Sequence, residues 1–494
     1  EFAISNFYVD KVDEDKLVEE AIIKMLAQLD PHSTYSDAEE VKKMNEPLQG
    51  NFEGIGVQFQ MIEDTLLVVQ PVSNGPSEKI GILAGDRIIA VNDSAIAGVK
   101  MSTEEIMKRL RGPKGSKVNL KIVRRGVQDP LVFTVKRDKI PILSLDASYM
   151  IQPKTGYIRI NRFGATTAEE FKKAMKELQK QGMKDMILDL QGNGGGYLNA
   201  AIDLANEFLG QKELIVYTEG RTAKRSDFYA KGNGEFRNGR LIVLVDEYTA
   251  SASEIVSGAV QDWDRGIIVG RRSFGKGLVQ RPIDLPDGSM IRLTIARYYT
   301  PAGRCIQKPY DSSTDYNKDL IERFNHGELM NADSIHFPDS LKVQTKKLGR
   351  TVYGGGGIMP DYFVPIDTTL YTDYHRNLVA KGAVIKFTMK FIEGHRKELA
   401  NKYKKFESFN EKFIIDDDML ATLREMGEKE GVKFNEEQYQ KSLPLIKTQL
   451  KALIARDLWD MNEYFRVMNT TNESVQKALE ILNSEEYQKK LRAN

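Results

Sequence analysis

Residues 241–263, "LIVLVDEYTASASEIVSGAVQDW", join a continuous apolar run to a segment whose apolar residues have helical spacing. A short run such as "LIVLV" is typical of a strand that is covered on both faces. Ser251 stands where the helical segment begins, and Glu254 follows three residues later, which is the spacing of a capping box. The stretch therefore predicts a buried strand, a turn and a helix, with a serine at the turn.

The same alternation continues on both sides of this stretch. Apolar strands precede or follow helical segments at "GYIRI" (156–160) with a helix over 167–181, "DMILDL" (185–190) with "YLNAAIDLANEFL" (197–209), and "GIIVG" (266–270). This order predicts an α/β fold with a largely parallel sheet flanked by helices. Ligands of such sheets bind beyond the carboxyl ends of the strands, where Ser251 falls.

The 494 residues are too many for one core, so we expect a multidomain chain. The patterns divide it into a helical lead-in (1–49), a β-rich module with short strands and glycine turns (50–138), the α/β core (139–368) and a charged helical region (369–494). An apolar stripe in the last region includes Leu443, Ile446 and Leu450, with Pro444 near a helix start. The stripe predicts a structural helical domain, and a partner or dimer surface is the alternative.

The composition excludes several classes of function. The chain is 41% hydrophobic with a formal net charge of +1, so no basic field for nucleic acid is expected. Cys305 is the only cysteine, and the five histidines show no HxxH spacing, so we expect no disulfide and no metal site. No apolar run approaches ~20 residues and no signal peptide opens the sequence. The protein is therefore cytosolic, or its leader is absent from this sequence.

Ser251 has two interpretations. The first needs only a hydroxyl that caps the helix. The second makes Ser251 a nucleophile, which requires a base, and Lys276 in "GRRSFGKGLVQ" (270–280) is available between two glycines. A lysine acts as a base only when burial lowers its pKa from about 10.4 toward 7 or 8. A phosphate loop is excluded because Gly277 stands where Ser or Thr should bind magnesium.

A glycine-rich turn supplies hydrogen-bond donors near the same edge of the sheet. In "DLQGNGGGYLNAAIDL" (189–204), Gly195 and Gly196 lie between an apolar strand and a helix. Their amides, together with that of Ala252 at a helix N-terminus, can hold a developing oxyanion. A dinucleotide fingerprint would need a glycine at the position of Tyr197.

Several segments resemble the C-terminal processing peptidases, or tail-specific proteases, which are serine endopeptidases with a Ser–Lys pair. The resemblance is carried by "TASASEIVSGAVQDW" (249–263), "VGRRSFGKGLVQ" (269–280), "LDPHSTY" (29–35), "FEGIGV" (52–57), "LAGDRIIAVN" (83–92), "DGSMIRLTIARYYTPAGRCIQ" (287–307) and "GGIMPDYFV" (356–364). It implies that Ser251 is the nucleophile, Lys276 the base and Gln280 the residue that orients the lysine. The usual arginine after "DL" is Gln191 here, which leaves the anchoring of the glycine loop open.

Within this resemblance, residues 50–138 are similar to a PDZ domain. "GIGV" (Gly54, Ile55, Gly56 and Val57) resembles the loop that captures a terminal carboxylate, although a plain β-turn is the alternative. The resemblance implies that unfolded or extended protein C-termini are the substrates, and that the module regulates access to the active site. It implies no cofactor and no nucleic acid.

The resemblance also implies a bacterial cell envelope or periplasmic location, and the C-terminal helices could hold an adaptor or a homo-oligomer. Two other functions stay open. One is a catalytically inactive scaffold that bears a PDZ domain, in which Ser251 is only a cap. The other is an acyl hydrolase that is not a peptidase, such as a thioester hydrolase.

Overall fold

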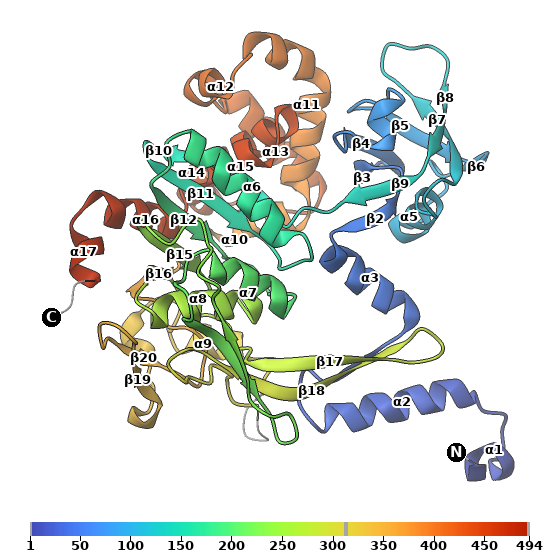
Figure 1. Ribbon diagram of the computed structural model, residues 1–494. Helices are drawn as coiled ribbons and strands as arrows, with labels where there is room; N and C mark the ends of the chain where they lie inside the picture. The colour runs from blue at the N-terminus through green and yellow to red at the C-terminus, as the bar shows by residue number, and fades with distance from the viewer. Residues whose placement is uncertain (1, 311–314, 492–494) are drawn as a thin grey trace. The chain divides into compact units, whose positions relative to one another are not determined.

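The computed structural model describes residues 2–310 and 315–491, so residue 1 and residues 492–494 of the two predicted end segments lie outside it (Figure 1). The chain forms two compact units. The first combines Glu1–Gln49, Leu143–Ile366 and Glu473–Asn494, and the second combines Gly50–Ile142 and Asp367–Asn472. Within the described ranges, no helix is both long enough and apolar enough to cross a membrane.

A six-stranded sheet forms the centre of the first unit. Its strands, in spatial order, are β10 (Leu145–Gln152), β11 (Thr155–Ile160), β12 (Asp185–Asp189), β15 (Leu241–Val245), β16 (Ile267–Gly270) and β21 (Tyr362–Phe363). All neighbouring pairs are parallel except β10 and β11. Every residue of β15 is buried, as its continuous apolar sequence predicted. The predicted α/β class is confirmed.

Three helices share the hydrophobic core with this sheet. They are α6 (Thr167–Lys180), α7 (Leu198–Asn206) and α8 (Ala252–Asp262). In α6 the buried residues are Thr167, Phe171, Met175 and Leu178, spaced by three or four, so they lie on one face. Helix α8 differs because all of its residues are buried. A helix enclosed on all sides gives Ser251, at its start, a rigid support.

A second sheet of five strands also belongs to the first unit. Its order is β1 (Thr34–Ser36), β18 (Met290–Tyr299), β13 (Leu214–Glu219) and β14 (Ser226–Tyr229), and β17 (Leu278–Asp284) pairs with β18. The β17–β18 hairpin is drawn as two long yellow strands in Figure 1. Strand β1 pairs antiparallel with β18 from Thr34 opposite Arg292 to Ser36 opposite Met290. The sequence did not predict β1, because three residues are too few to show an alternating pattern.

The lead-in is helical on both sides of β1. Its helices are α1 (Phe2–Phe7), α2 (Glu14–Ala27) and α3 (Ala38–Gln49). Asp30 and Pro31 lie in the connection between α2 and β1.

The remaining elements of the first unit are short. They are α9 (Asp319–Asn325), η1 (Ala332–Ser334), η2 (Asp339–Leu341), β19 (Lys342–Gln344), β20 (Thr351–Tyr353), α16 (Glu473–Asn483) and α17 (Glu486–Lys490). The last two helices are fixed to the central sheet, since the Leu241 amide donates to the Tyr487 hydroxyl at 2.9 Å. Arg240 also donates to the carbonyl of Leu482 at 2.5 Å.

The second unit contains a β-rich module and a helical region. The module has the sheet order β3 (Val57–Ile62), β4 (Thr65–Pro71), β5 (Arg87–Val91), β7 (Lys117–Val123) and β8 (Leu131–Lys136), with β6 (Ser94–Ala95) on β5. A separate ribbon pairs β2 (Asn51–Gly54) with β9 (Asp138–Pro141), and the helices are α4 (Pro76–Lys79) and α5 (Thr103–Leu110). Its own apolar core includes Ile88, Ile106 and Leu120.

The helical region of the second unit consists of α10 (Asp373–Ala380), α11 (Ala383–Lys402), α12 (Phe406–Lys412), α13 (Asp417–Lys429), α14 (Glu436–Leu458) and α15 (Met461–Met468). The stripe on α14 packs into a core of its own, in which Ile446 and Leu450 are buried. The predicted position of Pro444 near a helix start is wrong, because it lies inside α14. Asn435 caps that helix nine residues earlier.

Candidate active site

Ser251 lies in the turn between β15 and α8, in an unusual backbone conformation. Its φ is 56° and its ψ is −114°, whereas an ordinary N-cap residue has β-region angles. A non-glycine residue in such a region costs on the order of 1–3 kcal/mol and persists only where its surroundings hold it. The cap interpretation alone does not require this strain.

The carboxylate of Glu254 holds this turn against the turn that carries Lys276. It accepts the amide of Ser251 at 2.7 Å, the amide of Gly275 at 2.7 Å and the amide of Lys276 at 2.9 Å. It also accepts the Ser273 hydroxyl at 2.5 Å. Burial raises the pKa of Glu254 to about 7, although these hydrogen bonds favour the charged form. The capping-box spacing predicted only the contact with Ser251.

Tyr298 is a second link between the two turns. Its hydroxyl lies 3.0 Å from the carbonyl oxygen of Ser251 and also contacts the carbonyl oxygen of Lys276. Tyr298 is 1% exposed and comes from β18. Nothing in the sequence distinguished it from other core aromatic residues. Together with Glu254, it fixes the backbones of Ser251 and Lys276 next to each other.

One cavity of about 650 Å³ contains the residues that the sequence assigned to the reaction. Its lining includes Ser251, Ala252, Lys276, Gln280, Gly195 and Gly196. Residues from the lead-in, including Met44 and Leu48, complete the wall. Segments distant in sequence therefore meet at one site, beyond the carboxyl ends of the strands of the central sheet.

The environment of Lys276 favours a neutral amine. Burial lowers its pKa, and the positive charge of Arg292 lowers it further. The negative charges of Glu254 and Asp30 act in the opposite direction. Burial is the largest of these effects, so the pKa of Lys276 lies below the ordinary lysine value of 10.5.

The amide of Gln280 points its Nε2 at the hydroxyl of Thr294, at a distance of 3.3 Å. Both residues belong to the β17–β18 hairpin, in which they are paired. Gln280 also lines the cavity. It is therefore held on the side of the site formed by the second sheet.

The glycine turn approaches Ser251 so closely that side chains are excluded. A Cβ on Gly195, at φ +100°, would lie 2.8 Å from the Ser251 Cβ. A Cβ on Gly196, at φ +149°, would lie 2.1 Å from the carbonyl oxygen of Phe163. Glycine is required at both positions for steric reasons, in addition to backbone freedom.

The predicted oxyanion donors differ in their hydrogen bonding. The Gly195 amide donates to the side-chain oxygen of Asn193 at 2.9 Å. The Gly196 amide takes no part in the two bonds that bridge this loop to Phe163. The Ala252 amide is the first of α8, where an N–H has no acceptor within the helix.

Arg159 from β11 anchors the glycine loop in which Gln191 replaces the expected arginine. It donates to the Gln191 carbonyl at 2.8 Å and to Asp189 at 2.5 Å. Gln191 itself donates to Asp189 through its amide at 2.8 Å and through its side chain at 3.2 Å. At the next residue, the Gly192 amide donates to Asp246 at 2.9 Å. The loop is thus anchored without an arginine at position 191.

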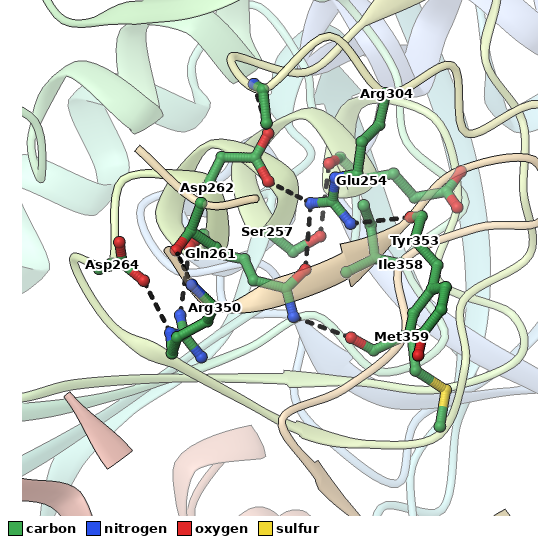
Figure 2. A network of polar contacts seen from close by, with 12 residues as sticks. Glu254, Ser257, Gln261, Asp262, Asp264, Arg304, Arg350, Tyr353, Ile358 and Met359 are labelled. Carbon is green, nitrogen blue, oxygen red and sulfur yellow. Dashed lines mark hydrogen bonds and ion pairs between the residues drawn. The ribbon is translucent and has the colours of Figure 1, made fainter. Parts of the chain in front are cut away.

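The far end of α8 is also fixed, as Figure 2 shows. Asp262 and Arg304 form an ion pair in which both side chains are fully buried. Gln261 donates to the carbonyl of Met359 at 2.8 Å, and Arg350 pairs with Asp264 at 2.7 Å. Breaking such a buried pair would leave an uncompensated charge. The helix that carries Ser251 is therefore held at both ends.

The predicted carboxylate loop belongs to the second unit. Gly54 ends β2, Val57 begins β3, and the two residues between them are buried. The Ser77 hydroxyl donates to the carbonyl of Ile55 at 2.6 Å. In the sheet of this module, β3 is at one end and pairs only with β4. An edge strand next to a tight loop is the arrangement that accepts an added peptide strand.

Sequence profiles of four known families match the chain. Peptidase family S41 matches residues 154–314, and a PDZ domain matches residues 54–139. The N-terminal domain of the activating protease CtpB matches residues 2–40. A family of unknown function matches residues 374–460.

Individual proteins that are similar in sequence are carboxy-terminal processing proteases. The carboxy-terminal-processing protease of Bartonella bacilliformis is 40% identical over 307 residues, which cover 61% of this chain and 69% of that protein. The carboxy-terminal processing protease CtpB of Bacillus subtilis is 37% identical over 308 residues, which cover 62% of this chain and 64% of that protein. This chain thus spans slightly less than two thirds of the Bacillus relative. A solved structure of the photosystem II D1 C-terminal processing protease is 32% identical, covers 61% of this chain and 82% of its own, and has a TM-score of 0.35.

Proposed function

Because the chain belongs to the carboxy-terminal processing proteases of peptidase family S41, we propose that it is a serine endopeptidase that cleaves proteins recognised through their C-terminal tails. The observation that carries the proposal is the shared cavity of a strained serine and a half-buried lysine, whose turns are joined by Glu254 and Tyr298. The cavity combines a nucleophile, a base and oxyanion donors.

The reaction begins when neutral Lys276 accepts the proton of the Ser251 hydroxyl. The Ser251 oxygen then forms a bond to the peptide carbonyl carbon, and the amides of Gly195, Gly196 and Ala252 stabilise the oxyanion. The Gly195 amide exchanges its bond with Asn193 for one with the oxyanion. Collapse of the intermediate breaks the C–N bond, and Lys276 returns the proton to the leaving amine. Water then releases the acyl group from Ser251.

Gln280 orients the amine of Lys276 without changing its charge. A carboxylate in the same place would favour the ammonium form and remove the base. An amide can fix the direction of the lysine and leave the nitrogen neutral. The position of Gln280 on the wall of the cavity supports this role.

The PDZ domain supplies recognition in this proposal. A substrate tail adds as a strand to β3, and the loop from Gly54 to Val57 receives its terminal carboxylate. Fluorescence anisotropy tests this with a labelled apolar peptide that ends in a free carboxylate and with the same peptide amidated at its C-terminus. Equal affinity for the two peptides would contradict capture of the carboxylate.

An inactive scaffold is the less favoured alternative. In a scaffold, Ser251 would need only to cap α8, and a β-region backbone would do so without strain. If Ser251 only capped the helix, the lowered pKa of the nearby Lys276 would serve no function. A thioester hydrolase would leave the PDZ domain at residues 54–139 without a role.

Cleavage of an unfolded protein with an apolar C-terminus tests the activity directly. We expect Ser251→Ala and Lys276→Ala to abolish cleavage. Ser257→Ala is the matched control, because this hydroxyl lies in the same helix and donates to the Ser253 carbonyl at 2.8 Å. Equal cleavage by all variants would disprove the proposal.

Location and assembly form a separate part of the proposal. The relatives named above from Bartonella and Bacillus are bacterial, and we assign the protein to the bacterial cell envelope, in the periplasm. The C-terminal helices would hold an adaptor or a second copy. Cell fractionation and light scattering of the purified protein test these two points.

A further inference from the structure

The lead-in contributes a buried aspartate to the neighbourhood of the catalytic lysine. Asp30 is 9% exposed and accepts hydrogen bonds on both carboxylate oxygens. One oxygen accepts the amides of His32 at 2.8 Å and Ser33 at 2.9 Å, and the hydroxyl of Thr294 at 3.0 Å. The other accepts the Ser33 hydroxyl at 2.6 Å. Asp30 therefore connects the lead-in to β18.

The donors around Asp30 fix the direction of a chain of hydrogen bonds. Backbone amides can only donate, so the oxygen of Asp30 that they contact is an acceptor. The Thr294 hydroxyl gives its one proton to this oxygen, and its own oxygen is left to accept. Gln280 must then donate to Thr294 through its NH₂ group. The structure has this orientation, with Gln280 Nε2 3.3 Å from the Thr294 hydroxyl oxygen. Its carbonyl oxygen is then left to accept another hydrogen bond.

We propose that Asp30 is a positioning residue for Lys276, acting through Thr294 and Gln280. Asp30 fixes the direction of the hydrogen bonds from Gln280 to Thr294 and from Thr294 to Asp30. The side-chain oxygen of Gln280 is thereby presented to Lys276 as an acceptor. The lone pair of the amine then points to the Ser251 hydroxyl. This inference rests on the proposed function, in which Lys276 is the base.

The charges around Lys276 provide a second measurable consequence, a change in the pKa of Lys276. The groups that affect its pKa come from three elements: Arg292 on β18 lowers it, Glu254 on α8 raises it, and Asp30 in the lead-in raises it. His32 is also close, but burial and the charge of Lys276 lower its pKa to about 4, so it is neutral at pH 7. Removal of the Asp30 charge therefore lowers the pKa of Lys276.

Two variants separate the effect of the hydrogen-bond direction from the effect of the Asp30 charge. Thr294→Val removes the hydroxyl and leaves the charge of Asp30. Asp30→Asn keeps one oxygen for the two backbone amides and removes the charge. We expect Thr294→Val to lower kcat at least tenfold with little change in KM. Asp30→Asn keeps the oxygen that accepts the Thr294 hydroxyl, so its kcat is expected to stay within a few-fold of wild type. Only Asp30→Asn is expected to move the acid limb of the pH profile to lower pH.

A conservative variant and a control exclude a purely structural explanation. Thr294→Ser keeps the hydroxyl and is expected to retain at least a third of the wild-type kcat. Ser289→Ala removes another hydroxyl bonded to an aspartate in the same hairpin, at 2.6 Å from Asp287, and should leave kcat unchanged. Wild-type kcat in Thr294→Val, or an equal loss in Thr294→Ser, would overturn the inference.

The pKa of Lys276 can be measured without proteolysis. Acetic anhydride modifies only the neutral amine, so the rate of labelling at each pH, followed by peptide mass spectrometry, reports the titration of Lys276. We expect the midpoint to fall in Asp30→Asn and to stay in place in Thr294→Val. An unchanged midpoint in Asp30→Asn would overturn the inference. A wild-type protein that cleaves nothing would instead disprove the proposed function, and labelling would still report on Asp30.

Discussion

Helices α5 and α8 begin with the same capping-box spacing, and in the proposed function only α8 carries a nucleophile at its start. Helix α5 follows Ser102, with Glu105 three residues later, and α8 follows Ser251, with Glu254 three residues later. Ser102 has the β-region backbone of an ordinary cap, with φ −65° and ψ 149°, and its side chain accepts the Glu105 amide at 3.2 Å. Ser251 instead has φ 56° and ψ −114°.

The two glutamates differ as much as the serines. Glu105 is exposed and pairs with Arg109 one turn later on the same helix. Glu254 is fully buried and binds the backbone of a second turn, the one that carries Lys276. The same four-residue spacing therefore gives a surface cap in one place and a buried junction in the other. The distinction lies in the tertiary partners.

The largest contrast is expected when each serine loses its hydroxyl. Ser251→Ala should lower kcat/KM for a protein substrate by a factor on the order of 10⁴ or more, because it removes the nucleophile. Ser102→Ala should leave the rate within twofold of wild type. Steady-state cleavage of one unfolded substrate by both variants measures the difference. Similar rates would make the two serines equivalent, and Ser251 would then be only a cap.

The glutamates provide the next contrast. Glu254→Gln places an NH₂ group where the carboxylate now accepts two donors, so buried amides or the Ser273 hydroxyl lose a partner. We expect a loss of about 3 kcal/mol in the free energy of unfolding and a fall in kcat on the order of 10²-fold, because the turns shift. Glu105→Gln should change stability by less than about 0.5 kcal/mol. Urea unfolding and cleavage kinetics measure both, and a normal kcat in Glu254→Gln would separate the junction from catalysis.

The sequence was sufficient for the fold class. Continuous apolar strands such as 241–245 predicted the parallel sheet, because strands covered on both faces have no polar positions. The family resemblance of the motifs is confirmed by the relatives. Ser251, Lys276, Gln280 and the glycines were proposed as site residues because the chemistry needs those residue types, and in the structure they line one cavity.

The supporting residues could not be predicted in the same way. Tyr298 is one aromatic among many in apolar strands, and its role depends on where β18 lies. Arg159 anchors the glycine loop from a neighbouring strand, so no spacing along the chain relates it to Gln191. The second sheet was missed because β1 has three residues and gains its pairing only through tertiary contact.

The next effect is expected in the pH dependence of stability. Burial raises the pKa of Glu254 from an ordinary 4.5 to about 7 in the folded state, so the folded protein binds a proton more tightly than the unfolded chain. This contribution is complete below pH 4.5 and is lost as the pH rises through 7. It amounts to about 3 kcal/mol at most, since one pKa unit corresponds to about 1.4 kcal/mol.

This contribution is isolated by measuring the free energy of unfolding of the wild type and of Glu254→Gln at each pH and taking the difference. Urea unfolding between pH 4 and 8 should give a difference that changes with pH in this window. Glu105→Gln provides the exposed control for the same subtraction. A difference curve for Glu254 that is flat across the window would contradict the assigned pKa.

The smallest expected effect concerns the stability of α5 and completes the contrast between the two serines. Ser102→Ala removes the acceptor of the Glu105 amide and should destabilise the start of the helix by about 1 kcal/mol. In native-state hydrogen exchange this corresponds to roughly fivefold faster exchange of the first-turn amides. Ser102→Asp should restore protection, because aspartate is an equally good cap. Aspartate at position 251 keeps an acceptor for capping but has no nucleophilic hydroxyl, so Ser251→Asp should be inactive. Activity in Ser251→Asp, or lost protection in Ser102→Asp, would show that the side chains act in some way other than capping in α5 and nucleophilic attack in α8.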